Sequence, residues 1–198
     1  MGAVELIGVA ASLSLLAGWR LYACIVAAGL AMRFGLLQLP QQIHALDVLA
    51  NPWVIGVAAV AAVAELFADK VMWLDSLWDG VHTLIRPLGG ALLAAAVIDP
   101  SDPTWQVVVF LLGGGAALLS HGAKAGARAV VNTSPEPVSN IVASTAEDVL
   151  SAGGLWLALT HPATAIVIAA MLLAAVLALA ALSWHLLGRL RRWFSRRA

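Results

Sequence analysis

The stretch that decides the fold is PATAIVIAAMLLAAVLALAALS, residues 162–183, which contains no charged side chain. A helix that crosses a membrane needs about 20 mostly apolar residues, so this run is long enough by itself. The rest of the chain has the same character, since 62% of its 198 residues are hydrophobic and only 11% are charged. Soluble domains have about a quarter of their residues charged. The sequence therefore predicts a membrane protein.

Proline favours the start or the end of a helix. Breaks that contain proline divide the whole chain, this run included, into six apolar segments. The predicted spans are residues 6–32, 52–69, 79–98, 104–126, 138–159 and 162–188. The runs are continuous and rich in Ala and Leu, whereas membrane β-strands alternate apolar and polar residues. We therefore predict an all-α, polytopic membrane helix bundle of about six transmembrane helices. Residues 1–188 form its single transmembrane domain, and residues 189–198 form a basic cytoplasmic tail.

Two weak internal similarities accompany this division. Residues 15–20 (LLAGWR) are similar to residues 119–124 (LSHGAK), in segments that would cross in opposite directions. Residues 75–100 and 139–162 are also similar, but with a different phase, so the two similarities do not define one repeat. Many transporters are inverted repeats with the binding site at their junction. An inverted repeat of three plus three helices is therefore left open.

The basic residues predict the orientation, because loops with Lys and Arg are retained in the cytoplasm. With six spans and both termini inside, nine of the eleven Lys and Arg lie in inside segments, Arg20 lies within the first span and Arg33 alone falls outside. We therefore predict a multi-pass protein of the bacterial inner membrane with both termini cytoplasmic. The basic tail would lie on anionic lipid.

Composition also excludes several classes of function. Eleven basic and eleven acidic residues balance, which leaves no basic surplus for nucleic acid. The single Cys24 excludes an intrachain disulfide and any cysteine-rich metal motif. No Gly-x-Ser-x-Gly or His-Glu-x-x-His motif occurs, so we expect no enzyme. We expect the lipid bilayer and a small ion or an anionic headgroup as partners, and a homo-oligomer stays open.

The ionisable residues of the predicted spans carry most of the functional information, because a charge at membrane depth is costly and usually faces a cavity or a partner. One polar stripe, spaced i, i+4, i+7 and i+11 on a helix, consists of Asp75, Asp79, His82 and Arg86. The candidate ion-binding residues are Glu65, Asp69, Asp75, Asp79, His82, Glu136, Asn140, Glu147 and Asp148. Their candidate charge partners are Arg20, Lys70, Arg86, His121, Lys124 and Arg128. We expect these groups to converge into one polar cluster.

Three functional hypotheses fit this pattern. The first is a small transporter or channel for a cation, divalent or proton-coupled, because hard cations bind several oxygens that carboxylates supply. A divalent cation would then be held by Glu65, Asp69 and Asp79. The second is a translocase for an anionic phosphate or lipid-phosphate headgroup, which basic side chains would clamp. The third is a structural or assembly protein whose buried ion pairs lock the bundle.

Several motifs resemble those of a known family. They are ELFADK (65–70), DSLWDGVHT (75–83), HGAKAGAR (121–128), NTSPEPVSN (132–140) and EDV (147–149). Together they resemble the bacterial integral membrane family called domain of unknown function 4126, and the likeness covers nearly the whole chain. This resemblance implies a helical membrane protein and assigns no activity to it.

The motif ELFADK is also similar to the Glu-x-Gly-Asp-Lys/Arg-Thr/Ser signature of manganese and calcium cation/proton exchangers. In this chain one extra residue separates the two acids, Ala68 replaces the glycine, and Val71 replaces the hydroxyl residue. The other half of the chain has no second copy of the motif. The resemblance implies that Glu65 and Asp69 bind a cation.

Overall fold

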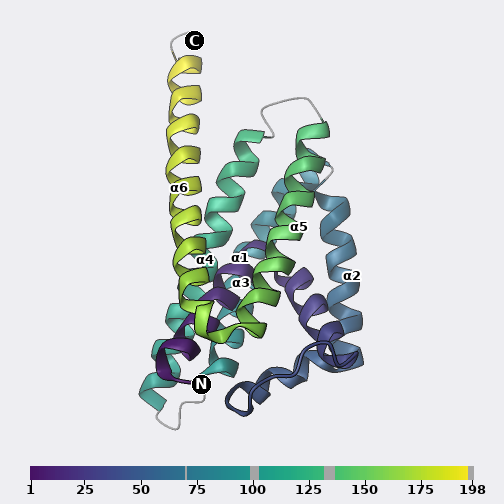
Figure 1. The fold of residues 1–198 in the computed structure, drawn as a ribbon. Helices are drawn as coiled ribbons and strands as arrows, with labels where there is room; N and C mark the ends of the chain where they lie inside the picture. Colours follow the sequence, from purple (N-terminus) through teal and green to yellow (C-terminus); the bar gives the residue numbers. More distant parts are fainter. Residues whose placement is uncertain (70, 99–102, 132–136, 196–198) are drawn as a thin grey trace.

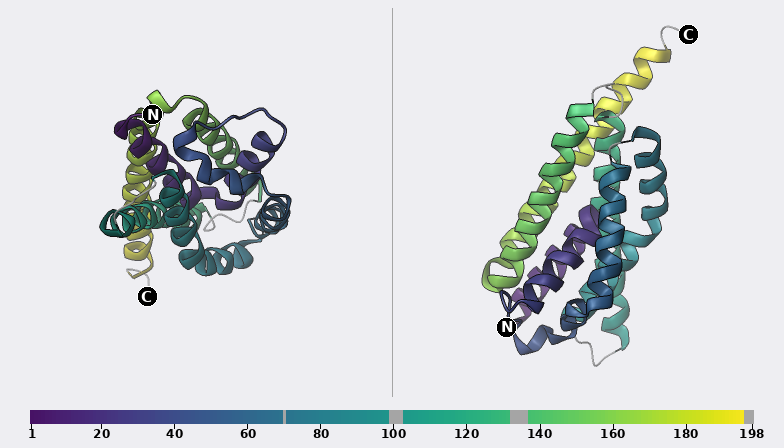
Figure 2. Two further views of the ribbon diagram at one scale, coloured as in Figure 1. Left: turned by 90° about the horizontal axis from the view of Figure 1, so that it is seen from below. Right: turned by 90° about the vertical axis from the view of Figure 1, so that its right-hand side faces the viewer.

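The computed structural model describes residues 1–69, 71–98, 103–131 and 137–195 (Figure 1). Its elements in chain order are α1 (Ala3–Arg33), the 3₁₀ segment η1 (Gln41–Ala50), α2 (Pro52–Ala68), α3 (Met72–Val97), α4 (Pro103–Val131), α5 (Pro137–Thr160) and α6 (Pro162–Ser195). The predicted all-α class is confirmed. Helices α2 to α6 run along the long axis of one bundle, as the two further views in Figure 2 also show.

Proline marks the helix starts, as the sequence indicates. α2, α4, α5 and α6 each begin with a proline, whose missing N–H costs nothing at the first position of a helix. At the start of α2, the Asn51 side chain also accepts a hydrogen bond of 2.9 Å from the backbone N–H of Trp53. This is an N-terminal cap, so local chemistry fixes where α2 begins.

The described helices contain fewer clear membrane spans than the six predicted. α1, α3, α4 and α6 are long and apolar enough to cross a membrane, and η1 with α2, which meet at 65°, make a fifth candidate. α2 alone has only 17 residues. α5 is long enough, but it carries polar residues that include Ser144, Glu147 and Ser151. The chain is therefore a multi-pass membrane protein with four or five candidate spans by this measure, and the arrangement of its helices does not establish the inverted repeat that the sequence left open.

α1 turns back inside the bundle, because its backbone is not helical at Arg20 (φ −144°, ψ 69°). Gly8, before this break, packs against the start of α6, and Gly29, after it, packs against the start of α2. Both of these helix starts lie at the lower end of the bundle in Figure 1. Leu13 and Ala28 line one small cavity, although a straight helix would separate them by about 22 Å. α1 is therefore a hairpin of two helical segments with Arg20 at its turn.

The N-terminus and the described end of α6 consequently lie at opposite ends of the bundle (Figure 1). The sequence predicted both on one side, from an even number of crossings. No Lys or Arg precedes Arg20, so the distribution of basic residues carries no information about the N-terminus. That prediction counted α1 as one full crossing, whereas the structure has a turn at Arg20.

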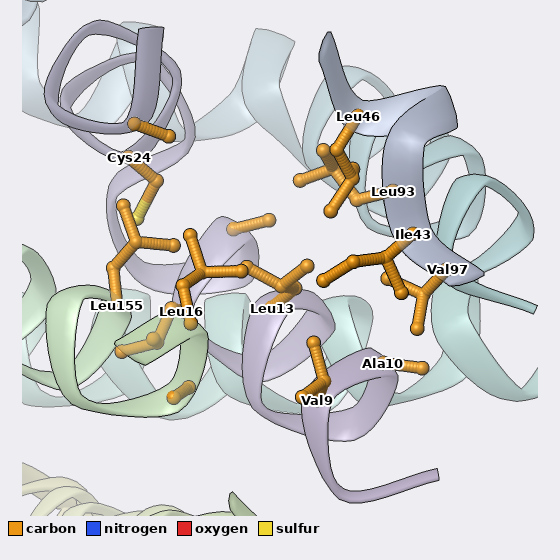
Figure 3. Close-up of a cluster of buried hydrophobic side chains, with 14 of the residues drawn as sticks. Val9, Ala10, Leu13, Leu16, Cys24, Ile43, Leu46, Leu93, Val97 and Leu155 are labelled. Carbon is orange, nitrogen blue, oxygen red and sulfur yellow. The ribbon is translucent and has the colours of Figure 1, made fainter. Parts of the chain in front are cut away.

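The hairpin is packed in an apolar core (Figure 3). Leu13 from its first segment and Cys24 from its second belong to one buried cluster with Leu155 of α5. η1 contributes Ile43 and Leu46, which are fully buried in the same cluster. The core therefore holds the two segments of α1 side by side.

Small residues let α1, α3 and α4 approach closely just before the turn. A Cβ atom on Gly18 would lie 2.8 Å from the Ala117 Cα, and one on Gly90 would lie 2.5 Å from the Ala117 Cβ. Neither position has room for a side chain, so the glycines there allow the helix backbones to approach closely. The close contact of Gly18 with Ala117 therefore determines where Arg20 lies along the axis of the bundle.

Candidate functional site

Ten ionisable side chains from α1 to α5 form a buried group, here called the charged cluster. Its basic members are Arg20, Arg86, Lys124 and Arg128, and its acidic members are Glu65, Asp69, Asp75, Asp79, Glu147 and Asp148. All of these side chains but that of Asp148 are at most 11% exposed, whereas the Asp148 side chain is 35% exposed. The predicted convergence of these groups is found, and the cluster is most open at Asp148.

The stripe on α3 faces the interior of the bundle. Asp75 and His82 are each 2% exposed and Arg86 is fully buried, because residues spaced three and four apart share one face of a helix. On the opposite face, Leu77 is 58% and Leu84 is 75% exposed. The stripe therefore faces protein, as the cost of a charge at membrane depth indicates.

Arg20, at the turn of α1, contacts four carboxylates. Its guanidinium nitrogens lie 2.6 Å from Asp69, 3.0 Å from Asp148, 3.2 Å from Glu147 and 3.3 Å from Glu65. A guanidinium has five N–H donors in a planar fork, so one arginine can serve several acceptors. The hairpin of α1 thus places one cation between the acids of α2 and those of α5.

The break in α1 also leaves backbone carbonyls at the end of its first segment. Lys124 Nζ donates a hydrogen bond of 3.3 Å to the carbonyl of Trp19, and Arg86 donates one of 3.5 Å to the carbonyl of Gly18. The last carbonyls of a helix lack partners within it, and cations are favourable there. The basic residues of α3 and α4 therefore stabilise the turn itself.

Glu65, near the end of α2, is the acid that links three basic residues. Its Oε1 atom accepts a hydrogen bond of 2.5 Å from Arg86 and one of 3.2 Å from Lys124, and it lies 3.3 Å from Arg20. The side chain of Glu65 is 2% exposed. One carboxylate thus joins α1, α2, α3 and α4 in a single network.

The connection to α5 passes through a second set of contacts. Arg128 forms a two-pronged pair with Glu147, at 3.2 Å through Nε and 3.1 Å through its terminal nitrogen. The Ser144 hydroxyl accepts a hydrogen bond of 2.6 Å from Arg20 and donates one of 2.9 Å to Asp69. Both charged and neutral groups of α5 therefore belong to the site.

Two histidines, His82 and His121, border the cluster, and the partners of His121 define its protonation. Arg86 lies 2.7 Å from His121 Nδ1, and an arginine only donates, so Nδ1 carries no proton. His121 Nε2 lies 3.0 Å from the carbonyl of Asp79, to which it must donate. His82 Nδ1 donates to the carbonyl of Trp78 at 2.7 Å, and its Nε2 is hydrogen-bonded to the Tyr22 hydroxyl at 2.9 Å. His121 is therefore held in its neutral form.

Not every predicted site residue can be placed. Lys70 and Glu136 lie outside the described residues, and so does the side chain of Asn140. In the described parts of the chain, no group of three or more His, Cys, Asp and Glu side chains is arranged to hold a metal ion. Glu65 and Asp69, two of the three predicted metal ligands, contact basic side chains instead.

Two polar neighbours of the histidines were not predicted. The Tyr22 hydroxyl is hydrogen-bonded to His82, and the Thr83 hydroxyl lies 3.2 Å from His121 Nε2. Tyr22 is the only tyrosine in the chain and lies two residues after Arg20, a signal that sequence reasoning could have used. Thr83 lies beside the predicted stripe of α3, and its sequence position alone gives no comparable signal.

Comparison with known proteins gives one match. A family model described as "Domain of unknown function (DUF4126)" matches residues 7–181. Neither the curated proteins nor the solved structures contain a match. The matched range includes every member of the charged cluster.

Proposed function

The chain belongs to the DUF4126 family, whose description names no activity, and from the geometry of the charged cluster we propose that it is a small membrane transporter for a cation. The observation that carries this proposal is the charge of the cluster, in which six carboxylates face four basic side chains. Even if Lys70 is counted with them, the acids outnumber the bases. A buried excess of negative charge is costly, and binding a cation offsets that cost.

The ion-pair distances favour Asp79 as a carrier of the cation. Glu65, Asp69, Glu147 and Asp148 each have a basic nitrogen within 3.1 Å, whereas the nearest ion-pair distance of Asp79 is 3.6 Å, to Arg86. A carboxylate whose charge is least compensated gains most from an added cation. Asp79 also lies at the edge of the cluster, with an 11% exposed side chain.

The proton is the cation that this arrangement fits best. Binding a metal ion requires several oxygen ligands around one point, and the described residues present no such group. A proton needs one acceptor at a time and a route of hydrogen-bonding groups. His82 with Tyr22, and His121 with Thr83, supply such groups beside Asp79.

The turn of α1 supports a transport function rather than a purely structural one. Transporter sites commonly lie where membrane helices are broken, since the free helix ends and the side chains at the break line a cavity. We place the N-terminus outside the cell and the basic end of α6 in the cytoplasm of a bacterium. In this topology the cluster lies in the cytoplasmic half of the membrane, and Asp148 is its exposed edge.

The other two functions remain outcomes of the same test. A translocase for an anionic headgroup would need basic side chains that are free to bind it, yet Arg20, Arg86, Lys124 and Arg128 each contact a carboxylate. A structural role requires that the ion pairs matter for stability and not for flux.

Asp79→Asn is expected to lower proton flux by about tenfold or more, because an amide cannot take up the transported proton. The assay uses purified protein in liposomes that contain a pH-sensitive dye, with an imposed membrane potential as the driving force. Asp47→Asn is the matched control, because Asp47 lies outside the cluster, pairs with His44 and has a 52% exposed side chain. Its flux should equal that of the wild type.

Asp148→Asn serves as the second variant, because it removes the exposed acid of the cluster. A wild-type protein without flux, or unchanged flux in both Asp79→Asn and Asp148→Asn, would contradict the transport proposal. Folded but inactive variants support it, and thermal unfolding of each variant shows that it is folded. Loss of stability with unchanged flux would favour the structural role.

A further inference from the structure

A groove of about 510 Å³ lies on the side of the bundle, away from the charged cluster, between the first segment of α1, the end of α3 and the first half of α4. Its floor consists of small buried residues, Ala10, Ala94 and Gly113. Its rim is open, since Ile7 is 53%, Trp105 61% and Leu112 69% exposed. The groove thus opens sideways, onto the surface that the spans turn to the membrane.

The side chains that line this groove are almost all apolar, so the groove suits a hydrocarbon ligand. Apart from the Trp105 ring, Ser14 is the one polar side chain among the lining residues that the structure describes, and its hydroxyl already donates to the carbonyl of Gly90 at 3.1 Å. A polar ligand would leave its own groups without partners here, at a considerable cost. The occupant is therefore apolar along its whole length.

The length of the groove matches one leaflet of a bilayer. Its lining on α4 runs from Trp105 to Ala116, twelve residues whose first and last Cα atoms are about 16 Å apart along the helix. The hydrocarbon of one leaflet is about 15 Å thick, half of the roughly 30 Å core. Trp105 lies near the start of α4, and tryptophan rings prefer the membrane interface. The groove therefore begins at headgroup level and ends near the centre of the membrane.

The volume decides between a lipid chain and a helix of a second copy. A helix about 10 Å across fills on the order of 400 Å³ in each turn of 5.4 Å. The groove would hold little more than one turn, although its length corresponds to three. A hydrocarbon chain fits both the length and the volume of the groove. It also gives the side chains that line the groove van der Waals contacts that they would otherwise lack.

We propose that this groove binds one acyl chain of a bilayer phospholipid, in the leaflet at the N-terminal end of α4. The proposal depends on the membrane embedding of the protein and not on its transport function. It assigns the lipid to a fixed site on α1, α3 and α4, in contrast to the exposed faces of α6, where lipids exchange freely.

The test compares variants that fill the groove with one that does not. Ala11→Phe and Ala116→Phe place a ring in the groove from its two opposite walls, whereas Ala170→Phe makes the same change at an exposed position of α6 outside it. Native mass spectrometry of protein extracted from phosphatidylcholine membranes should find one retained lipid on the wild type and on Ala170→Phe. Both groove variants should lose it.

A second measurement uses the wild type alone, so that the proposal does not depend on the folding of a variant. Phosphatidylcholine with a photoreactive acyl chain should label α4 between Trp105 and Ala116 at a single main site. Equal lipid retention in all four proteins, labelling spread evenly over α4 and α6, or a dimer that Ala116→Phe dissociates would each overturn the proposal.

Discussion

Arg20→Gln is expected to destabilise the protein by about 3–5 kcal/mol, the cost of removing one partner from a buried ion pair. Arg20 is 1% exposed and contacts four carboxylates, so its loss leaves three buried acids and the partly exposed Asp148 without their common cation. The substitution also removes the charge that holds the turn of α1 between α2 and α5. Thermal and denaturant unfolding of the purified protein in detergent measures this loss.

Arg20→Lys should recover little of that stability, because an ammonium group is a compact point charge without the planar fork of donors. Arg33→Gln is the matched control, since Arg33 ends the same helix and is exposed. It should change the free energy of unfolding by no more than about 0.5 kcal/mol. Equal stability of Arg20→Gln and Arg33→Gln would show that the contacts of Arg20 do not hold the bundle together.

Glu65→Gln should have a comparable effect, because it removes the one acid that joins Arg20, Arg86 and Lys124. We expect a loss of about 3–5 kcal/mol. In the double variant Glu65→Gln/Lys124→Gln an acid and a base are removed together, so the cluster keeps the charge of the wild type. Its loss should fall short of the sum of the two single losses by about 0.5–3 kcal/mol, the range for residues in one network.

The control for this double-mutant cycle pairs Glu65→Gln with Asp47→Asn. Asp47 pairs with His44 and shares no ion-pair partner with Glu65 among the residues that the structure describes, so these two effects should add to within about 0.5 kcal/mol. Strict additivity in the Glu65 and Lys124 cycle as well would mean that the two side chains act independently. The network described for the charged cluster would then be contradicted.

Helical periodicity explains why much of the site could be predicted. The spacing of Asp75, His82 and Arg86 fixes one face of α3 whatever the rest of the bundle does, and that face is buried. The cost of a charge in the membrane then predicts that acids and bases from separate helices must meet. Which base meets which acid could not be predicted, because the pairing depends on how α1, α2 and α5 pack.

The turn of α1 could not be predicted from the sequence, for a physical reason. Residues 6–32 are as long and as apolar as a crossing helix, and nothing between Gly18 and Arg20 breaks a helix by itself. The reversal depends on contacts distant in the sequence, namely those of Arg20 with the acids of α2 and α5 and that of Gly18 with Ala117. The prediction of both termini on one side rested on counting α1 as one straight crossing.

The central claim is that α1 enters the bundle and turns back at Arg20, and a single distance tests it. Spin labels at Val4 and Phe34, which are 62% and 72% exposed, report the separation of the two ends of α1 when the buried Cys24 is replaced by Ala. A straight helix would hold these residues about 45 Å apart. Pulsed electron paramagnetic resonance in liposomes should give one narrow distribution well below that distance. A distribution centred near 45 Å would show that α1 crosses the membrane, and would contradict both the hairpin and the charged cluster assembled around it.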